Sequence, residues 1–508
     1  VGTDAGLLVT TGTSNVLLGA LAGDAFTDAD FNIAIGKNSL GADTLGSASV
    51  AIGHGALLTQ NFTTATSVYN VAVGHNAGKL VTTAVFNTLV GGLAGDALTT
   101  GQENAAFGYL ALSGDTLGSH SVAVGSYALQ AQNFTTATDS FNTAVGYAAG
   151  TAVTTGLNNT LIGGQAGDAI TAANDNVALG VGSLTTNTLS SENVAIGRSA
   201  LQELNHTTAT DGFNVAVGSD AGKLVTTGIR NTLIGGNSGD SITDADNNTA
   251  VGFNTLISNV LGSKSIAIGS FALESQNPAT AADTHNVAVG VSAGGAVTTG
   301  LNNTLIGSLS GDALTSGNSN VAVGKDALGG DTTGSGSVAV GKDSLKVQNN
   351  TTSTTMYNVA VGLEAGAAVT TGVENTFLGG LAGDAITTSE GNVAIGYQAL
   401  TTEDTTGKAT AVGWKALAQQ NAGANSYNVA VGNNAGFSVS TGTANTFVGG
   451  LAGDGTDDGT NNTAMGYLAL SANCGNDNTA IGKSSLQVAT GGGNVAVGKD
   501  AGLSLTSG

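Results

Sequence analysis

Short apolar runs of three residues recur along the whole chain, and each lies between a polar residue and a glycine. The phrase reads Asn, then Val or Thr, then Ala or Leu, then Val or Ile, then Gly, as in residues 70–74 and 142–146. A run of this length that is rich in β-branched residues favours a strand over a helix. The pattern therefore predicts one short β-strand per phrase.

The glycines that end the phrases define the period of the repeat. Gly74, Gly146 and Gly218 lie 72 residues apart, and the steps within each interval are 17, 17, 17 and 21 residues. A repeat too short to hold a strand and a normal helix predicts a solenoid in which each repeat is one coil. The predicted fold class is all-β: a parallel β-solenoid of about 28 coils, with four coils in each super-repeat and a single continuous solenoid over residues 1–508.

The residue that opens the phrase is the most regular polar position in the chain. It is asparagine in 23 of 28 repeats, including Asn70, Asn142 and Asn214, serine in four repeats and alanine in one. Two structural roles remain open at this stage. The amides could form a hydrogen-bonded ladder along stacked coils, or the asparagine could be a turn residue that tolerates unusual backbone angles. Neither role requires a ligand.

Both faces of the predicted strand are apolar in many repeats. Side chains alternate along a strand, so the central residue, such as Leu89 or Leu161, faces away from its two neighbours. One face fills the coil, and the other would leave an apolar stripe more extensive than monomers normally show. We expect copies of the chain to associate through this stripe by rotational symmetry. The alternative is a thicker monomer with two internal layers.

Composition and charge narrow the classes of function. The chain has 13 Lys and Arg residues and a net charge of −22, which argues against nucleic acid and against an anionic membrane surface. Gly, Thr, Asn and Asp interrupt every apolar run, so we expect no membrane insertion. The single cysteine excludes a disulfide scaffold. No known catalytic motif is present, and we expect neither enzymatic activity nor a cofactor.

One aspartate recurs at the same place in every super-repeat, directly after a glycine, as Asp96, Asp168 and Asp240. A Ca²⁺ ion takes six to eight oxygen ligands. One carboxylate in every four coils supplies too few of them, so we predict a turn-capping role without a bound metal.

The 21-residue repeats carry extra residues that predict a loop once per super-repeat. Loops on a rigid scaffold are where binding residues usually lie. The candidate ligand-facing residues at the loop tips are Asn61, Phe62, Asn133, Phe134, Asn205, His206, Asn349 and Asn350. For these tips, ligand binding and simple solvation are both open. An aromatic residue or a histidine ends each of these repeats, as Tyr69 and Phe141 do, and we predict that it plugs a locally widened core.

The phrases SVAIG (49–53), SVAVG (121–125) and SIAIG (265–269) resemble the head repeats of trimeric autotransporter adhesins of the YadA type. The longer phrases NTAVGYAAG (142–150) and NVAIGYQAL (392–400) are similar to repeats of bacteriophage tail-fibre proteins. The resemblance covers essentially the whole chain, although the repeats here are longer than those of the adhesins. It implies a left-handed parallel β-roll, three chains around one axis, and an extracellular or virion-borne fibre.

These observations lead to one expected function and two alternatives. We expect an extracellular fibre, adhesive or receptor-binding, that forms a homotrimer and contacts a host-surface glycan or protein. The first alternative is a purely structural spacer or filament subunit. The second is a solenoid that binds an ordered surface, such as ice or a polymer lattice, through repeated threonines such as Thr82–Thr83 and Thr154–Thr155.

Overall fold

The computed structural model of the chain describes residues 2–350, 352–405 and 407–507. Across these residues the chain forms strands, turns and bends, without a helix. It is a parallel β-solenoid of about 28 coils with repeats of about 17 residues, which confirms the predicted fold class. The chain divides into two compact units, Val1–Phe253 and Asn254–Gly508. A single continuous solenoid over residues 1–508 stays a prediction.

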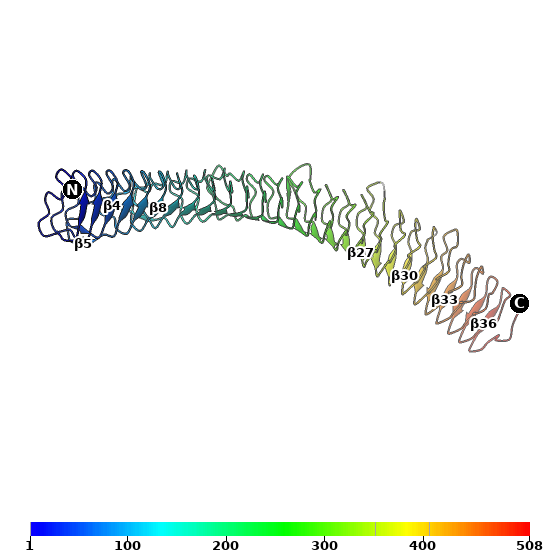
Figure 1. The fold of residues 1–508 in the computed structure, drawn as a ribbon. Helices are drawn as coiled ribbons and strands as arrows, with labels where there is room; N and C mark the ends of the chain where they lie inside the picture. Colours follow the sequence, from blue (N-terminus) through cyan, green and yellow to red (C-terminus); the bar gives the residue numbers. More distant parts are fainter. Residues whose placement is uncertain (1, 351, 406, 508) are drawn as a thin grey trace. The chain divides into compact units, whose positions relative to one another are not determined.

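Each phrase forms one strand of three residues, and within each unit every such strand pairs in parallel with the strand of the next phrase (Figure 1). The register is the same from coil to coil, as where Ala144 pairs with Leu161. The strands of the first unit are β1 (Val16–Leu18), β2 (Ile33–Ile35), β4 (Val50–Ile52), β6 (Val71–Val73), β7 (Thr88–Val90), β8 (Ala105–Phe107), β10 (Val122–Val124), β12 (Thr143–Val145), β13 (Thr160–Ile162), β14 (Val177–Leu179), β16 (Val194–Ile196), β18 (Val215–Val217), β19 (Thr232–Ile234) and β20 (Thr249–Val251).

The second unit repeats this arrangement with the same number of three-residue strands. They are β22 (Ile266–Ile268), β24 (Val287–Val289), β25 (Thr304–Ile306), β26 (Val321–Val323), β27 (Val338–Val340), β28 (Val359–Val361), β29 (Thr376–Leu378), β30 (Val393–Ile395), β31 (Thr410–Val412), β32 (Val429–Val431), β33 (Thr446–Val448), β34 (Thr463–Met465), β35 (Thr479–Ile481) and β36 (Val495–Val497).

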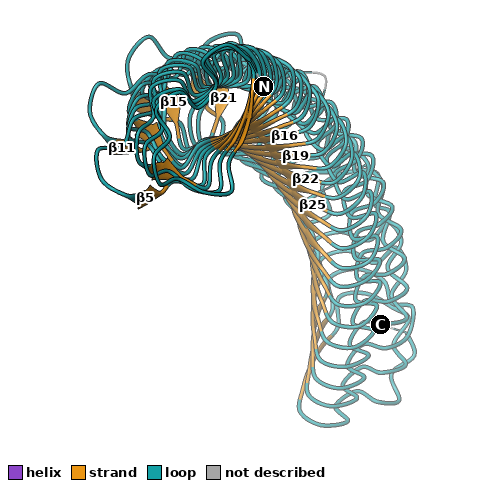
Figure 2. Ribbon diagram, turned by 60° about the vertical axis from the view of Figure 1, so that its left-hand side comes forward, coloured by secondary structure: helices purple, strands orange, loops and turns teal. Residues whose placement is uncertain are grey.

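The 21-residue coils, called long coils below, add a second pair of short strands. In each pair, two residues of the long coil lie parallel to two residues of the coil before it. The pairs are β3 (Gly46–Ser47) with β5 (Thr66–Ser67), β9 (Gly118–Ser119) with β11 (Thr138–Asp139), β15 (Ser190–Ser191) with β17 (Thr210–Asp211), and β21 (Gly262–Ser263) with β23 (Ala282–Asp283). The three-residue strands, one per coil, are called the main strand row. In the first unit, β5, β11 and β15 lie on a different side of the coil from this row (Figure 2).

Positions within a coil are numbered from the residue that opens the phrase: this residue is position 1, the strand is positions 2–4 and the phrase glycine is position 5. The final residue of a coil is its closing residue. At position 3 the side chain points into the coil, and Ala144 and Leu161 are fully buried there. At positions 2 and 4 the side chains point outward and are half-buried or exposed in every coil. The predicted apolar stripe is therefore formed by positions 2 and 4.

Interior volumes are matched between neighbouring coils. Position 9 is a buried Leu in some coils and Gly in others, and the glycines flank a large side chain at position 3. A Cβ added to Gly150 or Gly167 would lie 2.7 or 2.8 Å from the Leu161 side chain. In a later super-repeat Phe377 takes the place of this leucine, between Gly366 and Gly383. The alternation of Gly and Leu in the sequence therefore reflects a core of constant volume.

The phrase glycine at position 5 is required by its backbone angle and by the coil above it. Gly74, Gly146 and Gly218 have φ values of 144°, 141° and 142°, which L-residues rarely adopt. A Cβ at Gly163, the next phrase glycine after Gly146, would lie 2.5 Å from the carbonyl oxygen of Gly180. Only glycine lets successive backbones stack this closely.

Candidate functional site

The position-1 asparagines form a buried ladder along the solenoid. The side-chain oxygen of Asn142 accepts the backbone N–H of Asn159 at 2.9 Å, and its Nδ2 donates to the carbonyl of Gly156 at 2.7 Å. Asn70 and Asn214 accept the corresponding N–H of the next coil at 2.9 and 3.0 Å. The ladder therefore runs mainly from side-chain amide to backbone. Asn70, Asn142 and Asn214 hold the stack together and are fully buried.

A buried polar cluster replaces one rung of this ladder at the long coil. Ser121 stands where other coils have asparagine, and Gln132 fills the space that this leaves. The Nε2 of Gln132 donates to Ser121 Oγ and to Asp115 Oδ2, both at 2.7 Å, and its Oε1 accepts from Asn142 Nδ2 at 2.9 Å. Asp115 also accepts the backbone N–H groups of Gly118 and Phe134, at 3.1 and 3.3 Å.

The same four residue types recur in two other super-repeats, and the third super-repeat departs from them most. The cluster is built from Asp43, Ser49, Gln60 and Asn70 in the first unit, and from Asp331, Ser337, Gln348 and Asn358 in the second. In the third super-repeat the three corresponding residues change together, to Asn187, Asn193 and Leu204. There the ladder continues without the glutamine, because Asn193 Oδ1 accepts the N–H of Asn214 at 3.2 Å.

Three of the residues predicted to face a ligand at the loop tips point inward. Phe62, Phe134 and His206 are only 7%, 5% and 8% exposed, so the prediction of ligand-facing side chains is wrong for these three. The two phenylalanines begin the loop, and their burial follows from their backbone N–H groups being held by Asp43 and Asp115 in the core.

The loop-tip asparagines remain at the surface. Their side-chain oxygens accept from a threonine hydroxyl of the preceding coil at 2.7–3.1 Å: Asn61 from Thr44, Asn133 from Thr116, Asn205 from Thr188 and Asn349 from Thr332. Asn350 is half-buried, and its amide contacts the sulfur of Met356 at 3.6 Å. The next residue of this loop, Thr351, lies outside the described residues. Exposed amides, and not aromatic rings, are therefore what the loop tips present.

The closing aromatic residues, predicted to plug the core, are exposed instead. Tyr69 and Phe141 are 55% and 56% exposed, so this prediction is wrong. Both have positive φ angles, of 53° and 48°, and this turn of the backbone directs the side chain outward just before the buried asparagine. Tyr69 stacks on Phe86 of the next coil with a ring-centroid separation of 5.9 Å.

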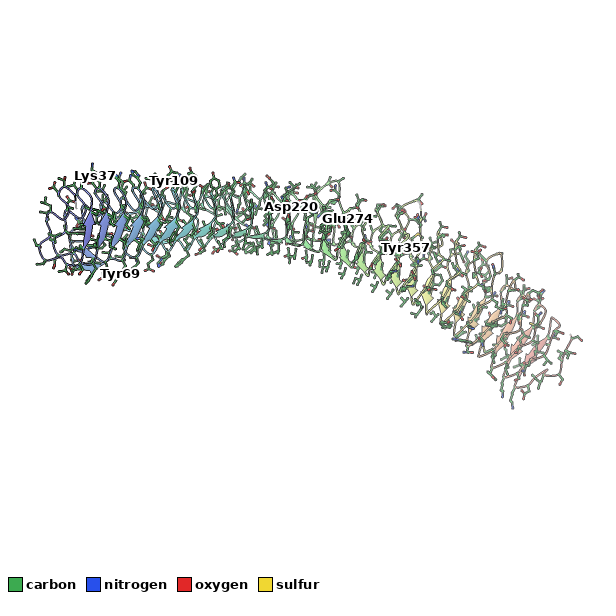
Figure 3. All side chains as sticks on the ribbon, in the orientation of Figure 1. Lys37, Tyr69, Tyr109, Asp220, Glu274 and Tyr357 are labelled. Atoms are coloured by element: carbon green, nitrogen blue, oxygen red, sulfur yellow. The ribbon has the colours of Figure 1, made fainter. Side chains whose placement is uncertain are left out.

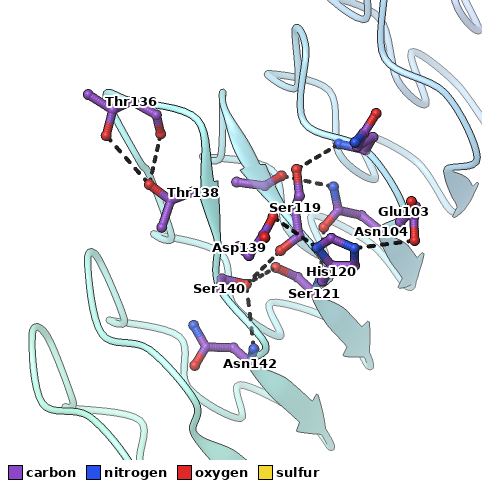
Figure 4. A network of polar contacts seen from close by, with 12 residues as sticks. Glu103, Asn104, Ser119, His120, Ser121, Thr136, Thr138, Asp139, Ser140 and Asn142 are labelled. Carbon is purple, nitrogen blue, oxygen red and sulfur yellow. Dashed lines mark hydrogen bonds and ion pairs between the residues drawn. The ribbon is translucent and has the colours of Figure 1, made fainter.

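His120, one of the five histidines of the chain, lies in a surface network between three successive coils (Figure 4). Its Nδ1 lies 3.0 Å from Asp139 and its Nε2 lies 3.2 Å from Glu103, while its ring stacks on Phe141 at 5.2 Å. Because both ring nitrogens face carboxylates, neither is placed to activate a serine. The arrangement links coils and is not a catalytic triad.

The recurring aspartates lie half-buried at position 10. Burial raises the pKa of Asp96, Asp168 and Asp240, while Lys79 and Lys223 act in the opposite direction on Asp96 and Asp240. In later copies a hydroxyl of the next coil donates to this carboxylate, as Ser471 does to Asp454 at 2.5 Å. Across the described part of the chain, no group of three or more His, Cys, Asp or Glu side chains is arranged to hold a metal ion.

The threonines suggested for ordered-surface binding are partly used within the chain. The hydroxyl of Thr82 donates to the carbonyl of Thr99 at 3.0 Å, and that of Thr154 to Thr171 at 3.1 Å. The neighbouring Thr83 and Thr155 are exposed. The first threonine of each pair is therefore a rung of a second ladder.

No protein-family model matches the chain, and no curated protein matches it significantly. The resemblance to adhesin and tail-fibre repeats therefore stays a prediction. In residues 2–350, 352–405 and 407–507 there is no pocket, and no helix of the length and apolarity needed to span a bilayer.

Proposed function

We propose that this chain is the repetitive shaft of an extracellular fibre, of the kind found in surface adhesins or phage tail fibres, assembled as a homotrimer. The observation that carries the proposal is the coil-to-coil repetition of both register and buried hydrogen bonds. Each coil supplies acceptors for the N–H groups of the next, as Asn142 does for Asn159, so adding coils adds length without changing the structure. The number of repeats in the sequence therefore determines the length of the solenoid.

The adhesive part of the proposal rests on the long-coil loops. The exposed amides of Asn61, Asn133 and Asn205 recur every 72 residues, which corresponds to four coils, or about 19 Å at the usual strand spacing. Several weak contacts to one host-surface glycan or protein layer would reinforce one another through this regular spacing. The purely structural spacer is the alternative function, and it needs no such contact.

Substitution of the loop amides separates the two functions. In the loop variant, Asn61, Asn133, Asn205 and Asn349 are replaced by serine. In the control, four exposed asparagines outside the long-coil loops are replaced by serine: Asn158, Asn247, Asn302 and Asn461. Binding is measured on an array of cell-surface glycans and on whole cells. We expect the loop variant to lose at least tenfold in apparent affinity and the control to retain it. Equal binding by both, or no binding by the wild type, contradicts adhesion at the loops and leaves the spacer.

A further inference from the structure

We propose that positions 2 and 4 of the main strand row, called the outer face, form the surface through which copies of this chain associate, coil against identical coil. This inference deepens the proposed homotrimer by assigning its interface, and it rests on that proposal. The outer face is continuous within each unit, from β1 to β20 and from β22 to β36.

The outer face is uncharged along its whole length, although the chain carries a net charge of −22. Position 4 is apolar in all 28 coils, and position 2 is Val, Ile, Thr or Ala. Phe107, Leu179 and Ile234 of the first unit and Leu378 and Met465 of the second are among its exposed large side chains. Two copies of so acidic a chain repel one another elsewhere. They can approach closely where no charge lies.

The size of the outer face fits a stable interface. The 14 strands of each unit, spaced about 4.8 Å apart and three residues wide, cover about 65 Å by about 10 Å, or about 650 Å². Exposed aromatic residues lie next to both ends of the strands, as Tyr69 and Tyr109 do in the first unit (Figure 3), and they widen this area. A standard interface buries about 800 Å² per partner. The two units together, with about 1,300 Å², therefore carry more surface than one standard contact needs.

Periodicity identifies the partner as a second copy. A partner that covers the outer face along its length must present complementary groups at every coil, with the same rise of about 4.8 Å. An ordinary globular surface has no such repeat. A copy related by rotation about an axis parallel to the stack has the same rise and brings each strand level with its equivalent. Val124 then lies at the height of Val124 in the other copies.

The outer-face threonines support this arrangement independently. Threonine occupies position 2 in the second coil of every super-repeat after the first, as Thr88, Thr160 and Thr232 in the first unit. Among the described residues, the hydroxyls of these three have no hydrogen-bond partner, in contrast to the laddered Thr82. In the rotational arrangement, each of these hydroxyls lies level with the same hydroxyl of another copy. Pairing between them would favour assembly in register, as polar residues do in coiled coils.

The first test is the mass of the full chain in solution. We expect light scattering to give three times the chain mass of 49.0 kDa. Lysine substitution of the half-buried Val124, Val145 and Ile162 should reduce the mass to that of one chain, with the β-sheet circular dichroism retained. Lysines at the exposed loop residues Thr64, Thr136 and Thr208 are the matched control and should leave the mass unchanged.

Cysteine cross-linking tests the register and does not depend on the lysine variant folding. In a Cys474→Ser background, Val124→Cys should cross-link copies with a short bismaleimide, whereas exposed Thr136→Cys should not. Mixed Val124→Cys and Ile162→Cys chains, which are offset by two coils, should form few mixed links. A wild-type chain with a mass of 49.0 kDa overturns the inference together with the homotrimer. An oligomer that withstands the lysines and fails to cross-link at Val124 overturns only the interface. Neither result depends on glycan binding at the loops.

Discussion

The phrase glycine is the residue that limits how closely coils can stack. Gly163 has a φ of 135°, and a Cβ there would lie 2.5 Å from the carbonyl oxygen of Gly180. We expect Gly163→Ala to destabilise the chain by about 2–4 kcal/mol, because it combines backbone strain with a steric clash in the coil above. The measurement is the urea midpoint followed by circular dichroism.

The neighbouring Gly164 provides the control for this prediction. A Cβ at Gly164 would meet nothing within 4 Å, and its φ is not in the left-handed region. We expect Gly164→Ala to change the free energy of unfolding by less than about 0.5 kcal/mol. Equal midpoints for the two variants would show that the stacking contact at Gly163 is not what demands glycine.

Residue-level prediction from the sequence succeeded where one position has one role. The asparagine ladder was foreseen as one of two alternatives, because a polar residue repeated in every coil must meet its own copies. For the long coil, the sequence pattern placed Phe62 at the surface and Tyr69 in the core, and the structure has the reverse. The two aromatic residues lie at opposite ends of the same loop, so either could fill the interior. Which of the two points inward depends on the positive φ of Tyr69, and a single side chain in the sequence does not reveal that angle.

At the scale of the coil, the buried polar cluster is the element that accommodates the extra residues. Gln132→Leu alone removes the partner of Asp115 Oδ2 and one of the two partners of Asn142 Nδ2, both buried in the core. We expect this single variant to lose about 2–4 kcal/mol of stability, since it leaves buried polar groups unpaired. The urea midpoint measures this loss.

The third super-repeat indicates which further substitutions should restore the stability lost in the Gln132→Leu variant. Asp115→Asn and Ser121→Asn combined with Gln132→Leu reproduce the residues at Asn187, Asn193 and Leu204, where the asparagine ladder runs on. We expect the triple variant to recover most of the stability lost by Gln132→Leu. Additive losses from the three substitutions would mean that the cluster is not one cooperative unit.

The three-residue strands, the period and the long coils could all be predicted from the sequence, because glycines and β-branched residues repeat at fixed intervals. The two-residue strand pairs of the long coils were not predicted. The cluster could not be predicted, because its members lie 6–27 residues apart and meet only once the coils are stacked. A signal was nevertheless present. Glutamine occurs at position 12 only in coils whose position 1 is not asparagine, as Ser49 with Gln60 and Ser121 with Gln132 show.

At the scale of the whole molecule, the repeat fixes the fold class but not the division into two compact units, since no change of composition marks Phe253. The outer face was foreseen as an apolar stripe from strand alternation alone. Which strand face points outward became clear only from the interior packing, where Leu161 fills the space between Gly150 and Gly167. The physical reason is that the interior accepts a large side chain at position 3 only where position 9 is glycine, while β-branched residues tolerate the exposed side of a strand.

Carboxylate burial gives the whole molecule an unusual dependence on pH. Burial raises the pKa of Asp43, Asp115 and Asp331 in the polar clusters, although hydrogen bonds from Gln60, Gln132 and Gln348 oppose it. Burial likewise raises the pKa of six position-10 aspartates: Asp96, Asp168, Asp240, Asp312, Asp384 and Asp454. A group whose pKa is higher in the folded state contributes stability that is complete below its ordinary pKa of 3.8 and is lost as the pH rises through the raised value. Protonation also reduces the repulsion within a chain of net charge −22.

We therefore expect the urea midpoint to rise as the pH falls from neutral toward the sequence pI of about 4.2. This is the opposite of ordinary acid destabilisation, in which paired carboxylates have lowered pKa values. Asparagine is a suitable control substitution for the buried aspartates, because Asn187 and Asn259 occupy the same coil position in other super-repeats. Replacing Asp43, Asp115 and Asp331 with asparagine should flatten the pH dependence and leave only the contribution of the position-10 aspartates. A midpoint that falls on acidification in the wild type would show that the hydrogen bonds to these carboxylates outweigh the effect of their burial.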